Sequence, residues 1–236
     1  MKPQILFLIP SLLIGVSHAE TGTPKDIREA GRIRIDGNLD DWKQIKWTPL
    51  TQTLDGNPEN ISNAQWALRW NDDGFLYIAV RYDDSSLLLH DSYVGSNAQD
   101  CIELFIRGDT GSQPNDYSKL QNSAQHYIFG LAKNKTAAWK KLANVNPFPM
   151  HNPASVAITL SGKTLTYEIM VPLYDKFDAS SRRHSKMTEV APEFEVGVDI
   201  AIVDVGANGY AGRKSENTMP DKECNADRIA EHTLGE

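Results

Sequence analysis

The stretch LRWNDDGFLYIAVRYDD, residues 68–84, decides the fold class of this chain. It contains two runs in which apolar residues alternate with polar or small ones, and the turn-forming residues Asn-Asp-Asp-Gly at 71–74 separate them. Alternation with a period of two places successive side chains on opposite faces of a strand. Gly74 can adopt the positive φ that a short hairpin connection needs. The stretch therefore predicts an antiparallel hairpin that buries one face.

Comparable strand-like runs, bounded by turn residues, continue along the chain. They are GRIRID (31–36), CIELFIRG (101–108), QHYIFGL (125–131), SVAITL (155–160), TLTYEIMVP (164–172) and EVGVDIAIVDV (195–205). A helical period is weak throughout, and only the segment from Pro172 offers the start of a short helix. The sequence therefore predicts an all-β protein, an antiparallel β-sandwich of the immunoglobulin-like or jelly-roll type with at most one or two short helices.

The first 19 residues differ in composition from the rest of the chain. Lys2 precedes an apolar run at 5–16, and Val-Ser-His-Ala at 16–19 has the small-x-small pattern of a cleavage site. Residues 1–19 are therefore predicted to be a cleaved signal peptide, and residues 20–236 a single domain of a secreted or periplasmic protein. The apolar run is too short to cross a bilayer comfortably, so we expect no membrane span.

Charge and cysteine content narrow the range of partners. The formal net charge of −7 makes nucleic acid a poor partner, because an acidic surface repels phosphate. The chain has two cysteines, Cys101 and Cys224, and an even number in an exported protein favours pairing. We expect a disulfide between them, with two separate thiols as the alternative.

Five segments, taken in order, resemble the family nine carbohydrate-binding modules within the DOMON-like group of β-sandwiches. They are IRIDGNLDDW (33–42), the 68–84 hairpin, DCIELFI (100–106), TLTYEIMVPL (164–173) and VDIAIVD (198–204). The resemblance implies an exported, non-catalytic protein that binds an oligo- or polysaccharide on one sheet, in association with polysaccharide breakdown. It also implies that Trp42, after the Ile-Asp-Gly turn, is buried in the fold rather than offered to a ligand.

The resemblance indicates where sugar would bind. Glu103 matches the glutamate of the family's Asp-x-x-Glu stretch, and Arg213 matches a late basic residue that contacts sugar. Asn97 stands where sugar-binding members carry one of two sandwiching tryptophans, and residues 219–224 contain no aromatic to supply the second. Glu103 is therefore predicted to act on an open face, with Asn97 beside it and without a pair of flanking rings.

Other aromatic residues are predicted to replace the missing rings. If residues 125–131 run through the same sheet as Glu103, Tyr127 and Phe129 are expected to share its face as a flat platform. Tyr93 is a further ring from a loop. The alternative is that Tyr127 and Phe129 are covered and that an internal partner holds Glu103. The predicted sugar contacts are Glu103, Tyr127, Phe129, Arg213, Asn97 and Tyr93.

The resemblance also implies one cofactor, calcium, since several members of the family hold it. Calcium takes six to eight oxygen ligands, so acids from several loops would have to converge. Asp83 and Asp84, at the end of one predicted strand, are the best pair. Their alternative role is to cap the turn that follows.

Two other functions compete with sugar binding. Some DOMON-like relatives bind haem, and here Met150, His151 and Met170 are the candidate axial ligands. A sandwich without its aromatic slot could instead serve as a docking or adhesion module for an exported partner protein. Catalysis has little support, because the sequence contains no nucleophile elbow, metalloprotease motif or phosphate loop.

Overall fold

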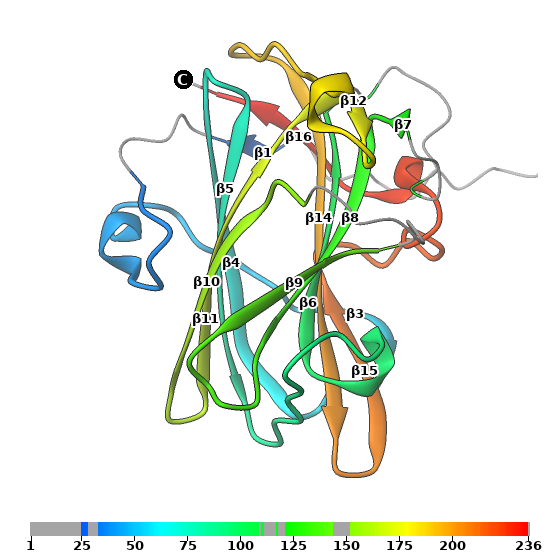
Figure 1. The fold of residues 1–236 in the computed structure, drawn as a ribbon. Coiled ribbons are helices and arrows are strands. Elements are labelled where there is room, and N and C mark those ends of the chain that lie inside the picture. The colour runs from blue at the N-terminus through cyan, green and yellow to red at the C-terminus, as the bar shows by residue number, and fades with distance from the viewer. Residues whose placement is uncertain are drawn as a thin grey trace, which may run out of the picture.

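The structure is a computed structural model that describes residues 25–27, 33–108, 110, 117, 121–143 and 152–235, with the backbone alone for 25–27 and 121–122. Two large β-sheets pack face to face (Figure 1). Among the described residues the only helices are single 3-10 turns, namely η1 (Leu39–Trp42), η2 (Ser96–Ala98), η3 (Arg182–His184) and η4 (Ala226–Arg228). The prediction of an all-β, mostly antiparallel sandwich is confirmed.

The first sheet has five strands and contains the predicted hairpin. Its order is β10 (Ser155–Ser161), β11 (Thr164–Pro172), β5 (Phe75–Asp84), β4 (Ile61–Asn71) and β2 (Thr48–Pro49). β4 and β5 pair from Asn71 with Phe75 outward, and Gly74 adopts a φ of 81° in the turn between them. A residue with a side chain would be strained at that position.

The second sheet has eight strands. Its main path is β1 (Lys25–Ile27), β16 (Glu231–Leu234), β14 (Glu195–Gly206), β6 (Cys101–Arg107), β8 (Ala124–Leu131) and β9 (Ala138–Leu142), and β15 (Gly209–Ser215) joins β14 to β3 (Gln52–Gly56). All of these pairs are antiparallel except β1 with β16. A small third sheet contains β13 (Lys186–Met187), β12 (Tyr174–Asp178) and β7 (Gln121–Asn122).

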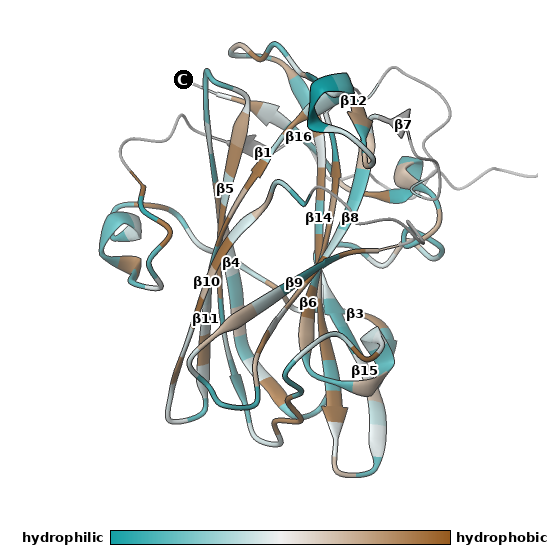
Figure 2. Ribbon diagram, viewed as in Figure 1, coloured by the Kyte–Doolittle hydropathy of each residue, from teal (hydrophilic) through white to brown (hydrophobic). Residues whose placement is uncertain are grey.

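The hydrophobic core lies between the two large sheets. Figure 2 shows hydrophobic residues along the central strands and hydrophilic ones on the connections. Ile102 and Leu104 of β6 pack there with Ile78 of β5 and with Trp66 and Trp70 of β4, all nearly or fully buried. Both tryptophans thus pack inside the sandwich.

The segment 33–47 covers the outer face of the five-stranded sheet. Trp42 is fully buried and packs on Ala67 and Ala79, and its Nε1 donates to Glu168 Oε1 over 2.8 Å. The backbone nitrogens of Asp36 and Gly37 donate to the other carboxylate oxygen of Glu168. The Ile-Asp-Gly turn is therefore closed around a buried carboxylate from β11, and the prediction that Trp42 is buried is confirmed.

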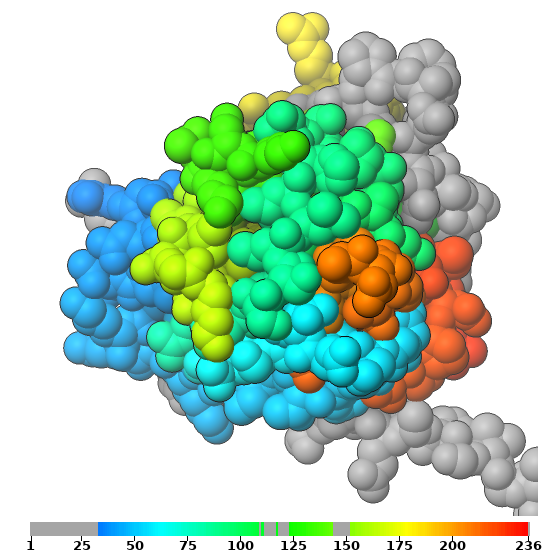
Figure 3. Space-filling model, turned by 90° about the horizontal axis from the view of Figure 1, so that it is seen from below, coloured from blue at the N-terminus to red at the C-terminus, as the bar shows by residue number. Residues whose placement is uncertain are grey.

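One end of the sandwich brings together segments that are far apart in sequence (Figure 3). There the residues between β5 and β6 (green) lie beside the turn between β14 and β15 (orange) and the residues around β3 (cyan). Asp100 Oδ1 accepts from the nitrogen of Val205, and Asn60 donates to Asp204. The first bond holds the connection between β5 and β6, which carries η2, against the eight-stranded sheet, and the bonds of Asn60 hold the connection between β3 and β4 there.

Candidate functional site

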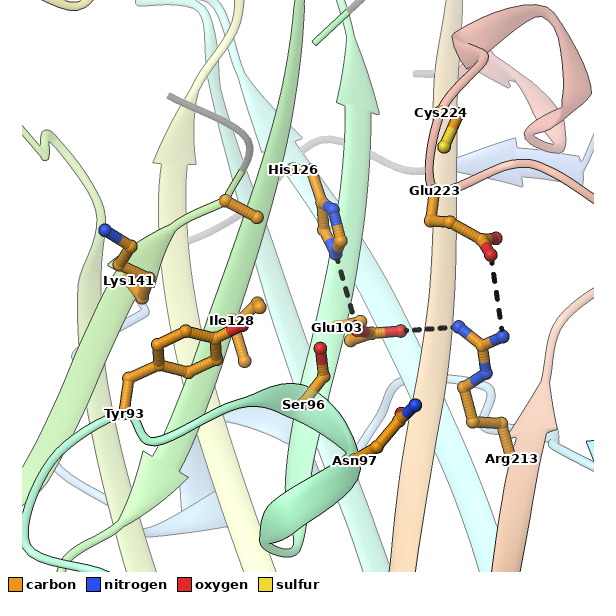
Figure 4. Close-up of a pocket in the computed structure, with 11 residues that line it drawn as sticks. Tyr93, Ser96, Asn97, Glu103, His126, Ile128, Lys141, Arg213, Glu223 and Cys224 are labelled. Carbon is orange, nitrogen blue, oxygen red and sulfur yellow. Dashed lines mark hydrogen bonds and ion pairs between the residues drawn. The ribbon is translucent and has the colours of Figure 1, made fainter. Parts of the chain in front are cut away.

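The candidate site is a cavity of about 500 Å³ on the outer face of the eight-stranded sheet (Figure 4). Glu103 of β6 pairs with Ile128 of β8 and with Ala201 of β14, so these side chains share that face. Four of the predicted sugar contacts line the cavity: Tyr93, Asn97, Glu103 and Arg213. Four further polar residues that were not predicted also line it: Ser96, His126, Lys141 and Glu223.

Glu103 lies at the floor of the cavity and is 2% exposed. Arg213 Nη1 donates to its Oε2 over 3.1 Å, and Ser96 lines the cavity beside the same carboxyl group. Burial raises the pKa of Glu103 above its usual range, and the charge of Arg213 opposes that shift. The carboxylate is thus held in one orientation with one oxygen beside the open space.

Arg213 is held by several acids. Its Nε donates to Asp55 Oδ2 over 3.0 Å, and Glu223 lies 3.8 Å from Nη2. Burial would lower the pKa of Arg213, but the bonds to Asp55 and Glu103 outweigh it and raise the pKa, so the guanidinium stays charged. The same pairing holds the pKa of Asp55 below its usual range, because the bonds from Arg213 and Tyr210 outweigh its partial burial.

His126 forms the wall opposite Arg213. Its ring stacks on Phe105 at a centroid distance of 4.3 Å, and burial lowers the pKa of His126 to about 3. The neutral ring therefore forms no ion pair with Glu103, although Nε2 lies 3.8 Å from Oε1. Neither ring nitrogen has a hydrogen-bond partner within the described part of the chain. A neutral imidazole thus brings one donor and one acceptor to the site, both unsatisfied.

Two rings stand together at the side of the cavity. Tyr93 lines it, and the Tyr93 ring lies 6.0 Å from that of Trp139, tilted by 58°. The Trp139 indole occupies the space above Gly130, where any side chain would overlap it. Both rings are partly exposed, so the site has an aromatic edge on one side rather than a slot between two rings.

A buried ion pair fixes the segment that supplies Glu223. Lys222 Nζ lies 2.8 Å from Asp199 Oδ1 and 3.3 Å from the carbonyl oxygen of Asn217, with both charged side chains fully buried. Burial lowers the pKa of Lys222 and raises that of Asp199 to about 6, and their mutual attraction opposes both shifts. Breaking such a pair leaves an uncompensated charge, so this contact holds the 216–230 segment in place.

The expected positions of Tyr127 and Phe129 were wrong. Tyr127 pairs with Leu104 and Phe129 with Ile102, so both rings point into the core and are fully buried. The register of β8 against β6 puts His126 and Ile128 on the face of Glu103 instead. The alternative was correct for these two rings, and an internal partner, Arg213, also holds Glu103.

The expected disulfide is not formed. Cys101 is wholly buried below η2, with its Sγ 4.0 Å from the carbonyl oxygen of Ser96, whereas Cys224 is exposed and lines the cavity. In the described part of the chain, no bond joins the two sulfurs. Cys101 is buried on the outer face of the eight-stranded sheet with Ile128 and Val203, and Cys224 lies in a surface segment, so the even count did not reflect proximity.

The two aspartates proposed for calcium lie on opposite faces of β5. Asp83 accepts from Asn63 and Thr164 near the surface, whereas Asp84 is buried beside Asp100 and Asp204. Asp83 and Asp84 therefore cannot both coordinate the same ion.

The three buried aspartates fit calcium by donor type. Burial, together with the neighbouring carboxylates, raises the pKa of Asp100 to about 8 and that of Asp84 to about 6. Asp84 Oδ2 has no hydrogen-bond partner within the described residues. Oxygen-only donors suit calcium, but no group of three or more acids, histidines or cysteines in the described ranges has a metal-binding arrangement as it stands.

Of the three candidate haem ligands, the structure describes only Met170. Met170 lies on the outer face of the five-stranded sheet, paired with Tyr77, while Met150 and His151 lie outside the described residues. Among the described residues, no helix is long and apolar enough to span a bilayer. The predicted signal peptide also lies outside the described residues.

Solved structures with the same architecture identify the fold. A family 9 carbohydrate-binding module from Caldicellulosiruptor kristjanssonii, in complex with cellotriose, has a TM-score of 0.64 at 15% identity, covering 90% of this chain and 94% of that one. The fold is that of a family 9 carbohydrate-binding module. A structure of such a module from the same organism, in complex with glucose, gives a TM-score of 0.62 at 16% identity over 90% and 97% of the two chains.

The similarity to family 9 modules is found by comparing structures and not by comparing sequences. A carbohydrate-binding protein from Bacteroides uniformis also shares it, with a TM-score of 0.55 at 10% identity over 90% of this chain and 100% of that one. No protein-family model matches the sequence, and no curated protein matches it significantly. At these identities the comparison establishes the family 9 fold, and the ligand has to be argued from the residues of this chain.

Proposed function

We propose that this protein is an exported, non-catalytic carbohydrate-binding protein whose ligand occupies the cavity around Glu103. One observation carries the proposal. A cavity of about 500 Å³ is lined by a buried carboxylate and by a buried, neutral imidazole that has no hydrogen-bond partner among the residues that the structure describes. A buried polar group without a partner costs free energy, so a ligand that offers hydroxyls would gain from binding here. The structures with the same fold that hold cellotriose and glucose support this ligand class.

The polar groups suit a sugar ring with neighbouring hydroxyls. Glu103 can accept a hydroxyl hydrogen, and neutral His126 can both donate and accept. Asn97 and Lys141 stand at the rim and can reach further oxygens. Arg213 is already engaged by Asp55 and Glu103, so its main role is to orient Glu103. The site therefore selects by hydrogen bonding more than by stacking.

The aromatic edge sets a limit on affinity. Stacking on Tyr93 offers one apolar surface to a sugar face, whereas a slot between two rings would offer two. We expect the affinity for a trisaccharide to lie in the range of about 0.1–1 mM, corresponding to about 4–5.5 kcal/mol.

Isothermal titration with cellotriose and with glucose tests the proposal. Saturable binding of either sugar, weakened about tenfold or more by Glu103→Gln, would support the cavity as the site. Glu195→Gln is the matched control, because Glu195 is an exposed acid at the start of β14. Equal binding by both variants would contradict the proposed site, and a broad glycan array without any bound sugar would contradict the ligand class.

Calcium is a second proposal, with its position revised. If the protein holds calcium, Asp84, Asp100 and Asp204 would supply its carboxylates in place of the pair Asp83 and Asp84. A cation there would favour the ionised form of Asp100, whose pKa burial raises to about 8, and would anchor the connection that carries η2. Added calcium should then raise the melting temperature and a chelator should lower it, and Asp84→Asn should remove both effects. A melting temperature that ignores calcium and chelator would rule out the site.

A further inference from the structure

A second cavity, of about 400 Å³, lies on the other large sheet, where β5 begins and β11 ends. The excursion of residues 174–187, which contains β12 at the top of Figure 1, forms its rim. Most of its lining is apolar. Beside Pro153 and Pro172 it contains Phe75, Met170, Tyr174, Met187, Arg182 and Ser185.

The apolar walls are suited to a flat ring. Phe75 pairs with Pro172 across β5 and β11, and Tyr174 pairs with Met187 across β12 and β13. The Tyr174 ring is also held by Phe177 at a centroid distance of 5.1 Å. Two aromatic rings and two thioethers thus face one space, and both groups make favourable contacts with an aromatic ligand.

The charge at this cavity is positive and comes from an arginine. Among the described residues that line it, Arg182 is the one charged side chain and none carries a carboxylate. The nearby acids are engaged elsewhere, since Asp175 pairs with Lys186 over 2.6 Å and Asp178 accepts from Ser180. Arg183, next to Arg182, is exposed and adds to the positive potential. This basic rim stands out in a chain with a net charge of −7.

We propose that this second cavity binds small planar aromatic carboxylates. The ring would occupy the space between Tyr174, Phe75 and the two methionines, and the carboxylate would pair with the guanidinium of Arg182. A guanidinium matches the two oxygens of a carboxylate with two parallel hydrogen bonds. A sugar fits less well, because the Ser185 hydroxyl already accepts from the backbone of Asp178 and few polar groups are left for its hydroxyls.

Titration with trans-cinnamate, followed by amide chemical shifts, tests the proposal. We expect saturable shifts at residues of the second cavity and not at those around Glu103. The uncharged isostere cinnamamide should bind about tenfold more weakly, because it loses the charged pair. Cyclohexanecarboxylate, which keeps the charge and lacks the planar ring, should also bind more weakly than cinnamate.

Variants separate the charge from the apolar walls. Arg182→Gln should weaken cinnamate about tenfold and leave cinnamamide unchanged, whereas Arg183→Gln, outside the lining, should change neither by more than about twofold. Met170→Glu places a carboxylate in the cavity and should abolish cinnamate binding. Glu103→Gln should bind cinnamate as the parent protein does, so this test is independent of the sugar site. Equal binding of acid and amide, an unaffected Arg182→Gln variant, or shifts confined to the Glu103 cavity would overturn the proposal.

Discussion

Two buried glutamates, Glu168 and Glu103, occupy equivalent places on the outer faces of the two sheets. Each lies on an inner strand, each is at most 2% exposed, and burial raises the pKa of each above its usual range. They differ in what covers them. Residues 33–42 cover Glu168 and donate hydrogen bonds to it. Glu103 instead faces a cavity, where the ring nitrogens of His126 have no hydrogen-bond partner among the described residues.

On the proposed function, the difference separates a structural carboxylate from a ligand-binding one. Glu168 accepts from the Trp42 indole and from two backbone nitrogens, so the fold supplies its donors. Glu103 accepts from Arg213, and its other neighbour, His126, is too far away for a hydrogen bond. Loss of Glu168 should therefore be measured as stability, and loss of Glu103 as affinity.

Glu168→Ala should give the largest effect, and it should be an effect on stability. Three donors, among them the buried Trp42 indole, would lose their acceptor, and we expect a loss of about 3 kcal/mol in the free energy of unfolding. For a chain of this length that loss lowers the melting temperature by about 6–12 °C. Chemical denaturation measures it, with Glu195→Ala as an exposed control that should change stability by less than about 0.5 kcal/mol. A loss no larger than that of the control would show that the turn does not depend on this carboxylate.

Glu103→Ala should change sugar affinity more than stability. We expect sugar affinity to fall by about 1.5–3 kcal/mol, because a charged hydrogen bond to a hydroxyl is lost. Stability should fall by less than in Glu168→Ala, since Arg213 keeps its bonds to Asp55. Titration calorimetry and thermal melting on the same protein separate the two quantities. A destabilised variant with unchanged sugar affinity would end the claim that this face is the site.

The sequence predicted the fold and half of the site, for identifiable reasons. Alternation located the strands, and the resemblance to family nine carbohydrate-binding modules implied that Trp42 is buried. Alternation alone does not choose which face of a strand is inward when both faces carry apolar residues. β8 is such a strand, with Tyr127 and Phe129 on one face and Ile128 on the other. The one available signal was His126, the most polar residue of that second set, together with Gly130.

Other parts of the site had no signal in the sequence. Glu223 enters the cavity because the buried pair of Lys222 and Asp199 fixes its segment, and nothing in the residue order predicts that pair. The separation of Cys101 from Cys224 likewise depends on how deeply each residue is buried in the folded protein. Local pattern specifies strands, whereas contacts between distant segments depend on the packing of the whole sandwich.

The pH dependence of sugar binding should further distinguish Glu103 from Glu168. The pKa of Glu103 is raised above 4.5, so its folded form takes up a proton more readily than the unfolded chain does. Its contribution to stability is therefore present at low pH and is lost as the pH rises through the folded pKa. Sugar affinity should move the other way, because it needs the ionised carboxylate and should fall as the pH drops through that same pKa. His126 stays neutral down to about pH 3 and does not contribute.

Calorimetry between pH 7 and pH 4.5, on the parent protein and on Glu103→Gln, isolates this effect. The parent should lose affinity over that range, and Glu103→Gln should show a flat profile. Glu168 also has a raised pKa, but it lies on the other sheet and should not alter sugar binding. Parallel pH profiles for the parent and Glu103→Gln would assign the dependence to another group.

Tyr93→Ala should give the smallest effect, and it tests the aromatic edge of the site. The ring lines the cavity on one side, and removing it should cost about 0.5–1.5 kcal/mol of sugar affinity, or roughly 2–12-fold. Val94→Ala is the matched control, because Val94 is the next residue, is 52% exposed and does not line the cavity. Tyr93 contacts Trp139, so fluorescence of the indole should report whether the wall is disturbed in the variant. If Tyr93→Ala binds sugar as tightly as Val94→Ala does, the ligand is held by the polar floor around Glu103 alone. A loss larger than that of Glu103→Gln would instead make stacking the dominant contact and would reverse the ranking of the two parts of the site.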